Sequence, residues 1–314
     1  MGGTPNAKVL VIVYQGEAAT YSPIWLVDQQ IQHIAAGTSF HGTSRPSIAF
    51  GLAGSVNISY TYPPTGTNGY INLKRIYEEF SICQRATQEN INEVWIYVDG
   101  KVNGNVYSPD EFLTNGPVWT KHYGYPDIDP PNCGRQMYTM LYNFDVGDEQ
   151  ELESWAHSAE WAFLVYESAG SESCDVGKPF GIEYGDAGWT TQQCNDTVGY
   201  SAVNGFMVLP DAVNNYVSVC GDVHYPPNIP AALAVRGYPE WEYIYDSPNT
   251  YQSRCTNWQW NTLTNTMPVS GATWGNTQVG YLKWWMQNMP GISNTLRGRN
   301  NAIRPNWWDF RLIR

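Results

Sequence analysis

Short apolar runs alternate with segments of helical periodicity in the first half of the chain, and this alternation constrains the fold most strongly. Residues 8–14 form a β-branched run typical of a buried strand, and a helical pattern follows from Ser22 and Pro23. Further strands are predicted at 56–62, 94–98 and 137–144, and further helices at 72–86 and 148–167. Strands that alternate with helices favour an α/β fold, with a mainly parallel sheet flanked by helices.

The second half of the chain has a different character. After residue 167 the sequence is rich in Gly, Asn and Pro, with a predicted strand at 216–224 and a last predicted helix at 277–288. Because no internal repeat or linker divides the 314 residues, we predict a single α/β domain over residues 1–314. We expect its core sheet at about 8–167 and a C-terminal part with long irregular loops at about 168–314.

Charge and hydropathy argue against two classes of partner. Lys and Arg total 17 against 29 Asp and Glu, which gives a net charge of −12, so the chain lacks the cationic surface that binds a nucleic-acid backbone. No apolar run approaches the roughly 20 residues that span a bilayer. We therefore expect no nucleic-acid partner and no membrane insertion.

Six cysteines are spread singly along the chain: Cys83, Cys133, Cys174, Cys194, Cys220 and Cys255. The absence of a C-x-x-C pair argues against a zinc ribbon or a thioredoxin-type redox site. An even count in a Tyr- and Trp-rich, Lys-poor chain predicts disulfide bonds in an oxidising compartment, with buried free thiols as the alternative. We therefore expect a secreted, extracellular protein whose signal peptide is absent from this chain, and the disulfide pairing stays open.

The helix predicted at 148–167 carries an acidic stripe beside an apolar one. The stripe falls within an arc of roughly 80° and consists of Glu149, Glu153, His157 and Glu160. The apolar arc should face the sheet and consists of Leu152, Trp155, Ala159, Phe163 and Tyr166. Carboxylates around an imidazole suit Zn²⁺ and some other divalent ions, whereas the alternative is a solvated helix face with a chance histidine.

A second histidine completes a possible metal site. His224 lies in the segment Cys220-Gly-Asp-Val-His-Tyr-Pro-Pro, at the end of a predicted strand. His157, Glu160 and His224 form the ligand set of a catalytic zinc that keeps an open position for water. The alternative for His224 is an imidazole that is hydrogen-bonded within a loop. The remaining histidines, His33, His41 and His122, are interpreted as structural or surface residues.

Polar residues at the predicted strand ends are candidates for binding and catalysis. Ligands of open α/β sheets bind outside the carboxyl ends of the strands, where this chain has Gln15, Asp99, Asn143 and Asp145. Glu153 or Asp145 is the candidate general base that activates a metal-bound water. Asp99 is expected to orient the substrate, and Gln15 and Asn143 are expected to bind it. Asp99 and Asp145 could equally cap turns or helices.

Tryptophans near the C-terminus suggest a sugar ligand. Trp faces stack on sugar rings, so Trp258 and Trp260 are candidate substrate-binding residues. The alternative for this aromatic cluster is packing in the core, which we prefer for Trp284 and Trp285.

Several motifs run in order over most of the chain. They are Val9-Leu-Val-Ile-Val, Asn92-Glu-Val-Trp-Ile-Tyr, Asn143-Phe-Asp-x-Gly with Glu153-x3-His157-x2-Glu160, Gly221-Asp-Val-His-Tyr-Pro-Pro-Asn, Tyr281-Leu-Lys-Trp-Trp and Asn306-Trp-Trp. Together they resemble a family of uncharacterised secreted α/β proteins from bacteria and fungi. The resemblance implies the α/β fold and secretion but no particular reaction. After the third strand, Asp99-Gly-Lys-Val-Asn-Gly stands where the family pattern has a Gly-, Pro- and Phe-rich segment.

A shorter motif resembles the ligand spacing of zinc carboxypeptidases. It consists of His157-Ser-Ala-Glu160-Trp161 and the later His224. Ala159 stands where those enzymes have Arg, and we interpret the likeness as convergent ligand spacing.

These observations predict a secreted, metal-dependent hydrolase that acts on an extracellular polymer. A glycan is favoured over a peptide as that polymer. The cofactor of the hydrolase is expected to be zinc or another divalent metal. One alternative is a carbohydrate-binding or cell-surface protein with a structural Ca²⁺, which takes oxygen ligands and has no use for imidazole. The other is a metal-free glycosidase that uses two of Asp145, Glu149, Glu153 and Glu160.

Overall fold

The computed structural model describes about half of the chain: residues 4, 6–15, 22–42, 45–59, 61–66, 71–98, 101–102, 105–106, 114–115, 129–135, 137–143, 147–167, 202–203, 206–207, 251–253, 267–269, 278–287, 291–292, 306 and 308. The chain divides into two compact units. The first comprises Met1–Ala35, Ile48–Ser158 and Leu312–Arg314, and the second comprises Ala36–Ser47 and Ala159–Arg311. The prediction of a single domain stays a prediction.

The first unit is built on a mainly parallel sheet, which confirms the predicted α/β fold. Its strands are β1 (Asn6–Tyr14), β2 (Ala49–Leu52), β3 (Asn57–Ser59), β4 (Glu93–Val98), β7 (Thr114–Asn115) and β8 (Tyr138–Asn143). The order is β2-β1-β4-β8-β7, with β3 paired to β1, and only β7 runs antiparallel to its neighbour. Two short strands, β5 (Lys101–Val102) and β6 (Asn105–Val106), form a separate antiparallel pair.

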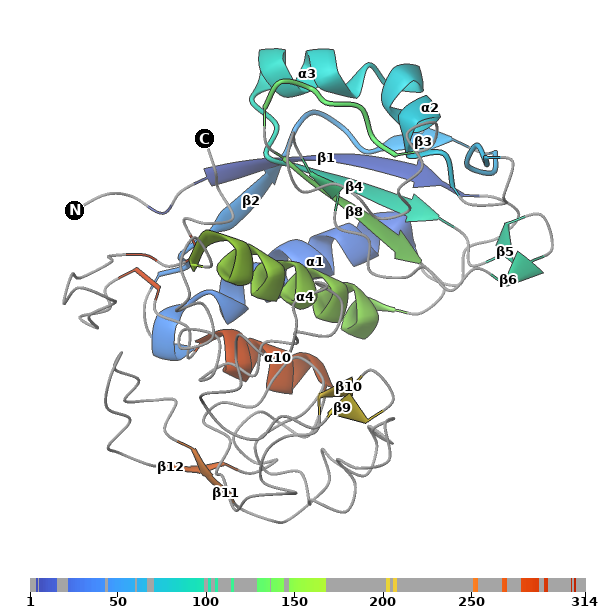
Figure 1. The fold of residues 1–314 in the computed structure, drawn as a ribbon. Coiled ribbons are helices and arrows are strands. Elements are labelled where there is room, and N and C mark those ends of the chain that lie inside the picture. The colour runs from blue at the N-terminus through green and yellow to red at the C-terminus, as the bar shows by residue number, and fades with distance from the viewer. Residues whose placement is uncertain are drawn as a thin grey trace. The chain divides into compact units, whose positions relative to one another are not determined.

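Helices cover both faces of this sheet (Figure 1). Helices α2 (Leu73–Glu79) and α3 (Ile82–Glu89) lie on one face, and α1 (Pro23–Gly37) and α4 (Asp148–Glu167) lie on the other. The central strands β4 and β8 are buried along their whole length because both faces are covered. This arrangement explains why those strands read as continuous apolar runs in the sequence.

Under α2 and α3 the core is largely aliphatic. We call this side the aliphatic face, and its buried residues include Leu10, Ile12, Ile76, Ile82, Val94, Ile96, Val98 and Leu141. Tyr14 and Tyr77 also belong to it, and each phenol has a hydrogen-bond partner. The Tyr14 hydroxyl donates to Glu79 Oε2 at 2.9 Å, and the Tyr77 hydroxyl bonds to that of Thr139.

Under α1 and α4 the core is rich in aromatic rings. We call this side the aromatic face, and its rings are Phe50, Trp95, Tyr97, Tyr142 and Trp155. Ring centroids of neighbouring pairs lie 5.1–6.3 Å apart, within the range of tilted and edge-to-face contacts. The two faces alternate along each strand, as the pleat requires.

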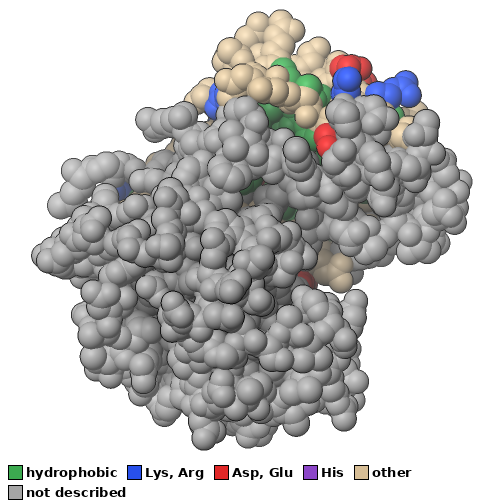
Figure 2. Space-filling view, viewed as in Figure 1, with side chains coloured by type: hydrophobic (Ala, Val, Ile, Leu, Met, Phe, Trp, Pro, Cys, Tyr) green, Lys and Arg blue, Asp and Glu red, His purple; other side chains and the backbone are tan. Residues whose placement is uncertain are grey.

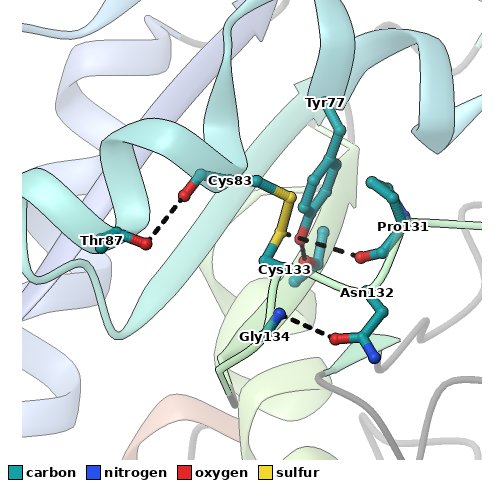
Figure 3. The surroundings of a disulfide bond; sticks show 8 residues. Tyr77, Cys83, Thr87, Pro131, Asn132, Cys133 and Gly134 are labelled. Carbon is teal, nitrogen blue, oxygen red and sulfur yellow. Dashed lines mark hydrogen bonds between the residues drawn. A yellow bond between two sulfur atoms is a disulfide. The ribbon is translucent and has the colours of Figure 1, made fainter.

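A disulfide bond ties the aliphatic face together (Figure 3). It links Cys83 of α3 to Cys133, 50 positions later and shortly before β8, with the two Cα atoms 4.8 Å apart. Tyr77 lies beside the bridge in Figure 3. This pair confirms that the chain forms a disulfide, and the other four cysteines lie outside the described residues.

The structure differs from the sequence-based prediction in two local features. The helix predicted over 72–86 is two helices, because Ser81 adopts a left-handed conformation (φ 51°) that interrupts the first. Strand β2 was not predicted. On α1 the apolar Ile24 is 53% exposed, whereas the polar Gln30 is buried.

The second unit contains helix α10 (Gln278–Gln287), which confirms the helix predicted near 277–288, and the short η1 (Phe40–Gly42). Two strand pairs, β9 (Ala202–Val203) with β10 (Phe206–Met207) and β11 (Tyr251–Ser253) with β12 (Met267–Val269), also belong to it. Ser47 connects distant segments, since Ile292 N–H donates to its hydroxyl at 2.8 Å and the Asn306 amide donates to its carbonyl at 3.0 Å. The strand predicted at 216–224 lies outside the described residues.

The described surface over α2 and α3 carries acidic and basic side chains together (Figure 2). Arg85 and Glu89 form an ion pair there at 2.7 Å. Mixed charges of this kind are typical of a solvated face and not of a cationic nucleic-acid surface. Among the described helices, none is long and apolar enough to cross a bilayer.

Candidate functional site

Most of the predicted site residues lie outside the part of the chain that the structure describes. This holds for Asp99, Asp145, His224, Trp258 and Trp260. His157 and Glu160 belong to α4, but their side chains are also outside the described set. Within the described residues, no group of three or more His, Cys, Asp or Glu side chains is placed to hold a metal ion. The zinc site stays a prediction.

The structure places three predicted site residues. The Gln15 N–H donates to the Ser59 carbonyl at 2.9 Å, which extends the pairing of β1 and β3 by one residue. Asn143 ends β8 and is buried, and Glu153 lies half-buried on α4. No described contact joins these three side chains to one another, so their predicted roles in one site stay predictions.

The strand order of the sheet reverses direction at β1. From β1 the chain passes to β2 and β3 on one side and then returns to β4 on the other side of β1. Such a reversal is a topological switch point, where loops diverge and leave a crevice outside the strand ends. The second-to-last residues of β4 and β8 are Tyr97 and Tyr142, which pair with each other in register.

A buried polar cluster lies next to these strand ends. We call it the Glu151 cluster, and it consists of Gln30 of α1, Tyr97 of β4, Tyr142 of β8 and Glu151 of α4. The Gln30 amide nitrogen donates to the Tyr142 hydroxyl at 3.3 Å and to the Glu151 carbonyl at 3.2 Å. The Tyr97 hydroxyl donates to Glu151 Oε2 at 3.4 Å. Four elements, α1, β4, β8 and α4, therefore meet through polar groups.

Burial controls the protonation of Glu151. Its side chain is 1% exposed, and this burial raises the pKa of the carboxyl group well above its ordinary value of 4.5. The Tyr97 hydrogen bond lowers that pKa and the nearby Asp148 carboxylate raises it, but burial is the largest of the three effects. Burial likewise raises the pKa of Tyr97, so its phenol stays protonated. Glu151 therefore carries its proton well above the pH at which a solvated glutamate loses it.

Two oxygens of the cluster are left without a hydrogen-bond partner. Glu151 Oε1 and Gln30 Oε1 are both buried, and no described residue donates to either. A buried acceptor without a partner costs about 1–3 kcal/mol. A site that keeps two of them unsatisfied is suited to a ligand or water with hydroxyl donors.

A second buried carboxyl group has a different environment. Glu93 begins β4, at the opposite end of the strand from Tyr97. Its Oε2 accepts hydrogen bonds from the indole nitrogens of Trp95 at 2.8 Å and Trp155 at 3.3 Å. These contacts join β4 to α4, so Glu93 has a structural role on the aromatic face.

An imidazole and a carboxylate also meet between α1 and α4. His33 Nε2 lies 2.9 Å from Asp148 Oδ2, and their side chains are 13% and 25% exposed. Asp148 is the first residue of α4, where the helix dipole favours a negative charge. His33 was interpreted from the sequence as a structural or surface residue.

Sequence reasoning missed Glu151 and Gln30, although a weak signal for both exists. Glu151 precedes the buried Trp155 by four residues and the buried Ser158 by seven, so helical spacing places it on the buried flank of α4. Gln30 follows the buried Leu26 of α1 by four residues and precedes the buried Ile34 by four. A single polar residue within an otherwise apolar helix face is therefore the sequence pattern that indicates these two residues.

Comparison of the chain with known protein families, with curated proteins and with solved structures finds no match. The resemblance to secreted bacterial and fungal proteins stays a prediction.

Proposed function

We propose that this protein is a secreted hydrolase that acts on an extracellular polymer, a glycan rather than a peptide, with Glu151 as its general acid. The observation that carries the proposal is a buried carboxyl group beside the carboxyl ends of β4 and β8, whose pKa is raised by burial. Hydrolysis of a glycosidic bond needs such an acid, because the departing oxygen must receive a proton as its bond to the sugar breaks.

The surroundings of Glu151 fit this role. Burial keeps its proton in place, and Tyr97 holds one of its oxygens and leaves the other free to face a substrate. Because Glu151 is 1% exposed, the proposal requires substrate binding to uncover the carboxyl group. Tyr97 and Tyr142 place hydroxyl groups in the same buried cluster.

Water completes the reaction by adding to the anomeric carbon and giving up a proton to a base. The proposed metal ligands His157, Glu160 and His224 would hold a zinc ion that activates this water. In the metal-free alternative, a second carboxylate or another basic side chain of the site takes the proton. Glu151 is the general acid of the metal-free version, because about two and a half turns of α4 separate it from the proposed metal ligand Glu160.

The direct test is hydrolysis of soluble polysaccharides by the wild type and by Glu151→Gln, measured as the release of reducing ends. We would use carboxymethyl-cellulose, xylan, chitosan and pectin. Loss of the acid should lower kcat by about 100-fold or more. The matched control is Glu79→Gln, since Glu79 also accepts a tyrosine hydroxyl but lies exposed on the opposite face of the sheet. Equal activity of Glu151→Gln and the wild type would contradict the assignment of the acid.

The metal is tested separately by mass spectrometry of the purified protein and of His157→Ala. About one equivalent of zinc that the variant loses would support the metal-dependent version. Calcium retained in both proteins would favour the carbohydrate-binding alternative. Absence of metal from both would leave the two-carboxylate version.

A further inference from the structure

The pair formed by His33 and Asp148 lies one helical turn from the Glu151 cluster. On α1, His33 follows Gln30 by three residues, and on α4, Asp148 precedes Glu151 by three residues. Residues three apart are neighbours on a helix surface. The contact between Gln30 and the Glu151 carbonyl and the contact between His33 and Asp148 are therefore adjacent links between the same two helices.

The contact with Asp148 fixes the tautomer of a neutral His33. A carboxylate only accepts hydrogen bonds, so Nε2 carries the proton in this contact. Nδ1 then keeps its lone pair and can accept a proton. A carboxylate that orients an imidazole in this way is the usual arrangement around a histidine base.

The surroundings of the pair differ from those of an ordinary surface ion pair. Arg85 and Glu89 both lie on α3 and join one turn of that helix to the next. His33 and Asp148 instead come from two helices and lie 115 positions apart in the sequence. Glu151, three residues after Asp148 on α4, has a buried carboxyl oxygen without a described partner. A donor that is buried and a base that is 13% exposed are thus one turn apart.

We propose that His33, oriented by Asp148, is the proton acceptor that works with Glu151 in the same site. This inference rests on the proposed hydrolase function and deepens it. His33 Nδ1 takes the proton of the attacking water, while Glu151 gives its proton to the departing oxygen, so protons balance over one turnover. Asp148 is a positioning residue, since it acts through the imidazole.

Among the described residues, few charged or titratable groups lie near His33 and Glu151. From α4 they are Asp148 and Glu149, and from β4 and β8 they are the phenols of Tyr97 and Tyr142. The neutral Gln30 separates the imidazole from the phenols along α1.

The test compares kcat and kcat/KM as functions of pH for the wild type, His33→Gln and Asp148→Asn, with the four polysaccharides named above. We expect His33→Gln to lower kcat about 100-fold and to leave KM within threefold. Asp148→Asn should give a smaller loss, about 10-fold, because the amide can still contact the ring. The control Arg85→Gln breaks the ion pair of α3 and should leave kcat unchanged.

A spectroscopic measurement covers the case in which a variant fails to fold. Long-range proton–nitrogen NMR spectra of the wild-type imidazole at pH 8 should show Nε2 protonated and Nδ1 with a lone pair. The opposite tautomer would overturn the inference.

The kinetic outcomes separate this inference from the function itself. A wild type that hydrolyses a polysaccharide, with His33→Gln unchanged in kcat, overturns the role of His33 and leaves the hydrolase proposal intact. A wild type that hydrolyses none of the four overturns both.

Discussion

The two faces of the central sheet are built from the same strands but bury different kinds of side chain. The aliphatic face packs Ile, Leu and Val under α2 and α3, and its buried tyrosines are paired. The aromatic face packs rings under α1 and α4 and includes two buried carboxyl groups, Glu93 and Glu151, of which only Glu93 has two indole donors. Burial of apolar side chains costs less free energy than burial of polar ones, because a buried polar group without a hydrogen bond destabilises the fold. The polar groups on one face therefore point to a function.

The largest expected effect concerns the aliphatic face. Replacement of Cys83 and Cys133 by alanine should lower the free energy of unfolding by about 4 kcal/mol, because the bridge closes a loop of 50 positions in the unfolded chain. Urea unfolding of the variant and the wild type measures the difference. The kcat of polysaccharide hydrolysis by the folded variant should equal that of the wild type. A large loss of kcat in the folded variant would show that the two faces are coupled.

On the aromatic face, Glu93→Leu should cost about 3 kcal/mol, since the indoles of Trp95 and Trp155 both lose an acceptor. Glu93→Gln keeps an acceptor oxygen and should cost about 1 kcal/mol. Chemical denaturation at one pH measures both. Equal costs for the two variants would mean that the charge, and not the hydrogen bonds, holds Glu93 in place.

A third difference appears when pH is varied. The pKa of Glu151 is raised in the folded protein, so its stabilising contribution is complete below its unfolded pKa and is lost as pH rises toward the folded pKa. From about pH 5 upward, the free energy of unfolding of the wild type should decline relative to Glu151→Gln by up to about 1.4 kcal/mol per pH unit. Denaturation curves at a series of pH values test this, and parallel pH profiles would contradict it.

The smallest effect has the opposite sign. Glu89 is hydrogen-bonded by Arg85, which lowers the pKa of its carboxyl group, so its contribution is present above the unfolded pKa and is lost as pH falls. Glu89→Gln should cost about 0.3–0.5 kcal/mol at pH 7, because the pair is partly exposed to solvent and spans one helical turn. A cost above 1 kcal/mol would show that this surface is more tightly organised than its exposure suggests.

The fold of the first unit was largely readable from the sequence, whereas the Glu151 cluster was not. Buried parallel strands such as β1, β4 and β8 produce continuous apolar runs, and α1 and α4 produce clear periodicity. The break between α2 and α3 depends on one backbone angle at Ser81, which the apolar spacing does not record. Edge strand β2 is only four residues long and is partly exposed, so it lacks the continuous apolar run.

The candidate site depends on contacts over long sequence separations. Glu151 meets Tyr97 across 54 positions, and its carbonyl meets Gln30 across 121. The acidic stripe of α4 drew the prediction to Glu153, which is half-buried, and away from Glu151 on the buried flank. Only the packing of α1 and α4 on the sheet identifies which carboxyl group loses its contact with water.

The most direct test of the account is the protonation of Glu151 itself. Carbon-13 NMR of the side-chain carboxyl groups, recorded from pH 3 to pH 9 and assigned by comparison with Glu151→Gln, gives the titration midpoint. Burial beside Tyr97 predicts a midpoint well above 4.5. A midpoint at or below 4.5 would show that Glu151 is ionised at neutral pH, and it would contradict its role as a general acid.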